Sequence, residues 1–93
     1  MNKFTTRVEL HDADSDDYET LHAEMERRGF ERTITGENGV PSHLPTAEYN
    51  YVGDVECKDV LNSAGAAAKV TGKKHGILVT EVSKRVWRGL IPV

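Results

Sequence analysis

The sequence predicts one α+β domain of the ferredoxin-like βαββαβ type, with a four-stranded antiparallel sheet, two helices on one face of it and a short extra strand at the C-terminus. Its length of 93 residues is that of a single domain, so residues 1–93 are expected to form one unit. Two segments place apolar residues at helical spacing, and the segments around them alternate apolar and polar residues as strands do. The order of these segments along the chain predicts the fold class.

The first strand and the first helix follow each other at the N-terminus. Residues 3–11 alternate polar side chains with side chains that suit a core, the period of two expected for a strand with one buried face. Short polar and acidic residues come next, and Asp14 or Ser15 is suited to cap a helix, whose positive N-terminal end the acids favour. The helix is expected to run to about Arg28, where Gly29 supplies the left-handed residue that ends it.

A hairpin is predicted in the middle of the chain. Residues 30–35 alternate again, and residues 36–39, Gly-Glu-Asn-Gly, form a turn from residue types that tolerate a positive φ. Pro41 and Pro45 lack the amide hydrogen that a strand ladder needs, so the third strand is expected to start only near Thr46.

The second half of the chain supplies the second helix and the last strands. Residues 55–70 carry small apolar side chains on one stripe, and Gly72 ends this predicted helix. Residues 76–82 form the fourth strand, and residues 86–90 a further short strand. Trp87 in that last strand is expected to extend the edge of the fourth strand, in its own subunit or in a partner's, which predicts a homodimer. The alternative is that Trp87 only covers the end of the core.

Composition excludes several classes of protein. No apolar run approaches the roughly 20 residues of a membrane span, and no signal peptide is recognisable at the N-terminus. The single cysteine, Cys57, excludes an internal disulfide framework and a multi-cysteine zinc site, which fits a cytoplasmic protein. The net charge is −3, but residues 1–57 hold five Lys and Arg against thirteen Asp and Glu, whereas residues 58–93 hold seven against two. The second half therefore offers basic residues to an anionic partner.

Chemistry-bearing residues are expected to meet at one rim of the predicted sheet. In the ferredoxin-like strand order the end of the first strand lies beside the starts of the third and fourth, which brings imidazoles, a carboxylate and ammonium groups together. These residues are His11, Asp12, His43, Lys73, Lys74 and His75. Metal-independent cleavage of RNA needs a base, an acid and a cation, and this group contains all three. The alternative is that they are solvated loop residues.

Other candidates lie outside the rim. His22, beside the apolar stripe of the first helix, is interpreted as a half-buried, hydrogen-bonded histidine, and it is the alternative catalytic residue if the rim histidines do not converge. Tyr49 and Tyr51 share one strand face, for core packing or for stacking bases. No H-x-x-x-H or H-E-x-x-H spacing occurs, so no metal site and no cofactor is predicted.

Basic residues are the candidate contacts to RNA phosphates. These residues are Arg7, Lys73, Lys74, Lys84 and Arg85. For Arg7, on the solvated face of the first strand, the alternative is an ion pair with Glu9, Glu31 or Glu48 on the same or neighbouring strands.

The first half of the chain resembles a known family. The matching residues are Asn2-Lys3-Phe4, Thr6, Leu21, Met25, Phe30, Gly39, Pro41 and Leu44. In these residues the chain is similar to the endoribonuclease antitoxins of type V toxin–antitoxin systems, the GhoS-like family. The resemblance implies a ferredoxin-like fold similar to that of the small CRISPR-associated nucleases, dimerisation, and cleavage of the messenger RNA of a small membrane toxin. The chain departs from the family on the first helix, where His22 stands at a place expected to carry a basic side chain.

Three functions follow as hypotheses. The first is a GhoS-like endoribonuclease that cleaves single-stranded messenger RNA by acid–base catalysis without a metal. The second is a non-catalytic dimeric binding or regulatory module. The third is a metal-dependent small nuclease that uses Asp12 of each subunit at a dimer axis and requires magnesium.

Overall fold

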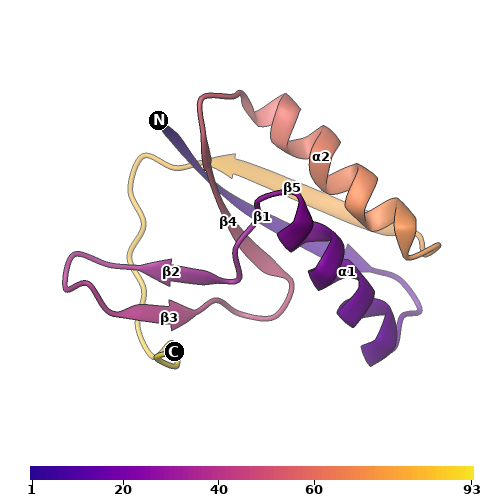
Figure 1. Cartoon of the computed structure of the whole chain (residues 1–93), viewed down its shortest axis with the longest axis horizontal. Coiled ribbons are helices and arrows are strands. Elements are labelled where there is room, and N and C mark those ends of the chain that lie inside the picture. Colours follow the sequence, from indigo (N-terminus) through magenta and orange to yellow (C-terminus); the bar gives the residue numbers. More distant parts are fainter.

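The computed structural model describes residues 1–93 as two helices and five strands (Figure 1). In chain order they are β1 (Asn2–Leu10), α1 (Ser15–Arg27), β2 (Thr33–Thr35), β3 (Pro41–His43), β4 (Glu48–Gly53), α2 (Cys57–Val70) and β5 (His75–Glu81). Strands β4, β1 and β5 form an antiparallel three-stranded sheet in that order, and β2 and β3 form a separate two-stranded sheet. The predicted α+β class is thus confirmed. No helix is long and apolar enough to cross a membrane.

Helix α1 begins and ends at the predicted signals. Asp14 is its N-cap: its side chain accepts a hydrogen bond from the Asp17 amide at 3.0 Å, and the Asp17 carboxylate accepts one from the Asp14 amide at 3.0 Å. This reciprocal box satisfies amides that have no partner within the helix. Gly29 follows the helix with φ +91°, a left-handed conformation that costs glycine little.

The core lies between the helices and one face of the three-stranded sheet. Alternate residues of β1, from Phe4 to Leu10, are buried there together with Tyr49 of β4, and α1 contributes Leu21 and Met25. Helix α2 presents buried alanines to this layer, and their small side chains let the helix approach the sheet closely.

The tyrosines of β4 belong to the core. Tyr49 is fully buried and meets the Phe30 ring edge-on at 6.3 Å, and Tyr51 lies 4.9 Å from the same ring. The structure therefore supports the core-packing interpretation, because Tyr49 has no surface left for stacking a base.

Three strands of the predicted four-stranded sheet are present, but residues 30–35 do not form a fourth strand along β4. They touch β4 at one isolated bridge between Glu31 and Asn50, whose backbone hydrogen bonds are 2.7 and 2.8 Å long. The chain then leaves β4, and β2 pairs with β3 instead. The hairpin turn is where it was predicted, and the strand expected to start near Thr46 is β4, which begins at Glu48. A short additional strand, β3, precedes it, so the expectation that the prolines keep residues 41–43 out of a strand was wrong. Pro41 is the first residue of β3, a position where proline is tolerated.

The predicted C-terminal strand is replaced by an irregular tail, residues 82–93, that runs from β5 past the β2–β3 hairpin (Figure 1). The tail meets β3 at its end: the His43 amide donates to the Ile91 carbonyl at 2.8 Å, and the Val93 amide donates to the Pro41 carbonyl at 3.0 Å. Trp87 packs over Gly36, where an added Cβ would lie 3.1 Å from the indole. Trp87 therefore covers the hairpin of its own chain and does not extend the edge of β5.

Candidate functional site

Three polar side chains form a row on the face of the sheet that turns away from the helices, here called the open face. Side chains alternate between faces along a strand, and the even-numbered residues Phe4 to Leu10 of β1 face the core. Arg7, Glu9 and His11 therefore lie on the open face, and each of them is exposed. Successive members of this row, the β1 row, are about 6.6 Å apart along the strand. No ion pair forms between Arg7 and any of the predicted glutamates.

The register of β5 adds Lys74 to the β1 row. The His11 amide donates to the Lys74 carbonyl at 2.8 Å, which continues the ladder in which Leu10 pairs with His75. Directly paired residues project to the same face of a sheet, so His75 shares the helix face with Leu10. Extending this register by one residue, as the His11–Lys74 hydrogen bond indicates, sets Lys74 on the open face with His11. The predicted meeting of these segments at one rim is found in the backbone, but the imidazoles of His11 and His75 lie on opposite faces.

Glu9 and His11 form the titratable pair of the site. The His11 Nδ1 lies 3.8 Å from the Glu9 Oε1, and the two side chains are 51% and 65% exposed. Because both side chains are largely exposed, the pair is accessible to a substrate. Beside Glu9, Gly76 presents no side chain, and an added Cβ there would meet nothing within 4 Å.

A shallow hollow adjoins this pair on the open face. It has a volume of about 220 Å³ and is lined by Arg7, Glu9, Gly76, Ile77 and Leu78. Leu78 lies opposite Arg7 in the ladder and is 66% exposed. The hollow thus brings one cation, one carboxylate and an apolar side chain together on the open face.

Several predicted site residues lie apart from the β1 row. His43 belongs to β3, where it pairs with Thr33 and hydrogen-bonds the tail. The His75 Nδ1 is 2.9 Å from the Lys73 carbonyl oxygen, and the Lys73 ammonium lies 3.7 Å from Asp17 of α1. These groups are engaged on the helix side of the sheet or in the hairpin.

Asp12 stands in the turn between β1 and α1, exposed and with φ +51°. This left-handed conformation is one that aspartate adopts more readily than most residues. No group of three or more His, Cys, Asp and Glu side chains is arranged to hold a metal ion.

His22 is packed in the protein as the structural interpretation predicts. It is only 9% exposed, and its Nδ1 lies 2.6 Å from the Tyr49 hydroxyl. Burial lowers the pKa of His22, with Arg32 adding to the effect, and burial also raises the pKa of Tyr49. Both groups are therefore neutral at pH 7, and the contact is a hydrogen bond between neutral partners.

Arg85 fastens the tail to the open face. Its Nη1 donates to the Thr5 Oγ1 at 3.0 Å and to the Asn50 Oδ1 at 2.9 Å, and burial lowers the pKa of this guanidinium. Lys84 beside it is exposed. The observed contacts give Arg85 a structural use, and only its remaining N–H groups are left to meet a phosphate.

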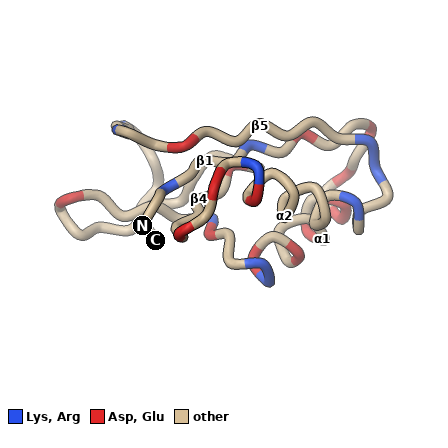
Figure 2. Tube along the Cα trace, turned by 90° about the horizontal axis from the view of Figure 1, so that it is seen from above, with Lys and Arg blue, Asp and Glu red and all other residues tan.

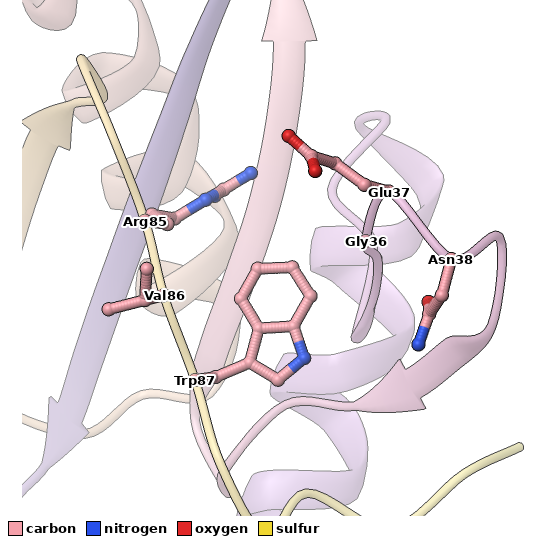
Figure 3. Close-up of a pocket in the computed structure, with 6 residues that line it drawn as sticks. All are labelled: Gly36, Glu37, Asn38, Arg85, Val86 and Trp87. Atoms are coloured by element: carbon pink, nitrogen blue, oxygen red, sulfur yellow. The ribbon is translucent and has the colours of Figure 1, made fainter.

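A second hollow of about 320 Å³ lies between the tail and the β2–β3 turn (Figure 3). It is lined by Gly36, Glu37, Asn38, Arg85, Val86 and Trp87. The carboxylate of Glu37 stands at this hollow together with the Arg85 guanidinium (Figure 3), so its charge opposes an anionic ligand there.

Charge on the molecule is mixed. Figure 2 shows Lys and Arg interspersed with Asp and Glu along the sheet and the helices, with no continuous basic stripe. The basic residues of the second half of the sequence are thus spread over the molecule and do not form one basic surface. Any attraction of an anion to the open face therefore comes from the few cationic side chains of the site.

His11, Lys74 and Arg7 were predicted as site residues from the sequence, whereas Glu9 was not. The signal was present, because Glu9 precedes His11 by two residues in an alternating strand and so shares its face. In comparisons with known proteins, no family model and no curated protein sequence matches the chain.

Proposed function

We propose that this protein is a GhoS-like endoribonuclease that cleaves single-stranded messenger RNA without a metal, at the site formed by Arg7, Glu9, His11 and Lys74. The observation that carries the proposal is that an imidazole, a carboxylate and two cations lie together on one exposed sheet face. These are the groups that acid–base cleavage of RNA requires. The resemblance of the first half of the chain to the type V endoribonuclease antitoxins supports the same activity.

We further infer that the fold is a ferredoxin-like one in which the outermost strand is reduced. The order β4-β1-β5, with the Glu31–Asn50 bridge on the outer side of β4, follows the ferredoxin-like order as far as it goes. The separate β2–β3 sheet then replaces the rest of the fourth strand. By the same resemblance, the natural target is the messenger RNA of a small toxin in a type V system, met in the cytoplasm by a homodimer.

The reaction uses the 2′-hydroxyl of the RNA as nucleophile. The neutral His11 imidazole takes the proton of that hydroxyl, and the 2′ oxygen bonds to phosphorus. Glu9 stabilises the imidazolium that forms. The bond between phosphorus and the 5′ oxygen breaks, and the Lys74 ammonium gives a proton to that oxygen. The products are a 2′,3′-cyclic phosphate and a free 5′-hydroxyl, and exchange with water restores both side chains.

The cations also position the substrate. The register between β1 and β5, extended by one residue, sets Lys74 opposite His11, where Cα atoms are about 5.5 Å apart, so its charge lies close to the scissile phosphate. Arg7 lies about 13 Å along the strand from His11 and holds a neighbouring phosphate of the same RNA strand.

The test is cleavage of a mixed-sequence, single-stranded RNA by the purified protein in EDTA. His11→Ala is expected to lower the rate by about 10²–10⁴-fold, the usual contribution of a general base. His43→Ala is the matched control, since it removes an exposed histidine in the hairpin, and His75→Ala is expected to retain activity because His75 faces the helices.

Each other outcome selects a different function. Activity that appears only with magnesium and is lost in Asp12→Asn identifies the metal-dependent nuclease. Binding of RNA without cleavage in either buffer identifies the non-catalytic module. Equal loss of activity in His11→Ala and His43→Ala refutes the site proposed on the open face.

A further inference from the structure

The two edges of the three-stranded sheet differ in how they are covered. The outer side of β4 meets the Glu31 bridge, which leads into the β2–β3 hairpin. The outer side of β5 has no partner strand, although β5 extends over His75–Glu81, about 23 Å. Natural edge strands are usually protected by proline, lysine or a bulge, and β5 contains none of these.

The hydrogen-bonding pattern shows which groups of β5 point outward. The Lys74 carbonyl accepts from His11 and the Val82 amide donates to the Lys3 carbonyl at 2.8 Å, so the even-numbered residues of β5 are the ones that bond to β1. In an antiparallel ladder the intervening residues direct both backbone groups the other way. The outward-facing residues are therefore His75, Ile77, Val79 and Glu81.

This outer edge is complementary to itself. When a second β5 is placed antiparallel with Leu78 opposite Leu78, Ile77 faces Val79 and His75 faces Glu81, on each side of the two-fold axis. All outward-facing backbone groups of both strands then have partners, and opposite charges meet at both ends when the histidines are protonated. If one β5 is shifted along the other by two residues in either direction, one outward-facing residue of each strand has no residue of the partner's β5 opposite it.

The apolar side chains of β5 favour the same arrangement. Leu78 is 66% exposed at the centre of the strand, and Ile77 and Val79 are only partly buried. In the proposed register the two Leu78 side chains form a non-hydrogen-bonded pair, the type in which side chains lie closest. An exposed leucine on the open face of one chain is thus covered by the same leucine of a second chain.

We propose that two copies of this protein associate through antiparallel pairing of their β5 strands, centred on Leu78, into a continuous six-stranded sheet. Such an interface is isologous, because the same surface contributes from both subunits. The open faces of the two sheets become one surface, with a β1 row toward each end. This pairing differs from the one expected through Trp87, and it does not rest on the proposed enzymatic function.

Disulfide trapping tests both the interface and its register. In a Cys57→Ser background, Leu78→Cys places two thiols on the axis, where paired Cα atoms are about 4.5 Å apart, within the range of a disulfide. Thr80→Cys is the matched control on the same strand face, because its two copies lie about 13 Å apart in this register. We expect mild oxidation to give a covalent dimer with Leu78→Cys and little with Thr80→Cys.

Mass in solution gives the second test, measured by light scattering over a series of protein concentrations. We expect wild type to approach the dimer mass at high concentration, and Leu78→Lys to remain monomeric because two ammonium groups face each other. Leu61→Lys, on a 42% exposed leucine of α2, is expected to dimerise like wild type. His75→Glu is expected to weaken the dimer, and His75→Glu combined with Glu81→Lys to restore it.

The proposal is overturned if wild type stays monomeric throughout, if Leu78→Lys dimerises like wild type, or if Thr80→Cys is trapped as readily as Leu78→Cys. Failure of the charge exchange to restore the dimer overturns the register. Circular dichroism of each variant confirms that the variant is folded, and the disulfide test stands by itself should Leu78→Lys fail to fold.

Discussion

The hydrogen bond between Tyr49 and His22 lends itself to a quantitative prediction. Tyr49 is fully buried, His22 is 9% exposed, and the two polar atoms are 2.6 Å apart. Tyr49→Phe removes the hydroxyl without changing the ring packing, and it leaves the Nδ1 of a buried imidazole without a partner. Leaving one buried polar group unsatisfied costs about 1–3 kcal/mol. For a domain of this size each kcal/mol lowers Tm by about 4–8 °C.

Urea denaturation at pH 8, followed by circular dichroism, measures this loss. At that pH His22 is neutral, because burial lowers its pKa, and the tyrosine is protonated, because burial raises the pKa of Tyr49. Tyr51→Phe is the matched control: Tyr51 packs on the same strand face, and its hydroxyl makes no hydrogen bond within the chain. Its effect is expected to stay within about 0.5 kcal/mol.

A stability cost of Tyr49→Phe no larger than that of Tyr51→Phe would contradict this prediction. That result would mean that the hydrogen bond contributes nothing net and that His22 finds another partner at no cost. A loss that is large in both variants would instead assign the effect to removal of a tyrosine hydroxyl in general, and not to the contact with His22.

Three further predictions concern single positions. The pKa of His22 is lowered in the folded state, mainly by burial, so protons bind the unfolded chain preferentially and the free energy of unfolding should fall as pH drops below 6.5. In urea titrations between pH 7 and 5, His22→Gln should make that fall smaller. Gly29→Ala places a Cβ on a residue with φ +91° and should lower the free energy of unfolding by about 1–2 kcal/mol; a neutral effect would show that the helix end relaxes. Arg85→Ala should speed hydrogen exchange at the amides that join the tail to β3, whereas Arg88→Ala, which removes an exposed cation, should not; equal exchange in both would show that the guanidinium does not hold the tail.

Much of the fold was predictable because its signals are local. The alternation of residues 3–11 predicts β1, and the cap at Asp14 and the stop at Gly29 bracket α1. A helix cap, a left-handed glycine and a side-chain period each depend on a few neighbouring residues, so they can be recognised in the sequence without knowledge of the rest of the chain. The turn at residues 36–39 belongs to the same group.

Predictions that needed partners from distant segments were less successful. Pairing of β2 with β3 competes with pairing of residues 30–35 along β4, and no local pattern decides between them. The strand expected at residues 86–90 carries a suitable pattern, but the tail is held by Arg85 on the sheet and by backbone contacts to β3. Intrinsic strand preference is weak compared with such contacts.

The candidate site shows the same division. The positions of Arg7, Glu9 and His11 on one face of a strand can be predicted from the sequence, because the side-chain period of a strand is two. The helical spacing also predicts that His22 lies at the margin of a buried helix stripe, whereas its hydrogen-bond partner, Tyr49, is known only from the structure. The tertiary structure alone decided that Lys74 joins His11 and that His75 does not. That choice depends on the register between β1 and β5, and a shift of one residue would have exchanged the faces of the two side chains.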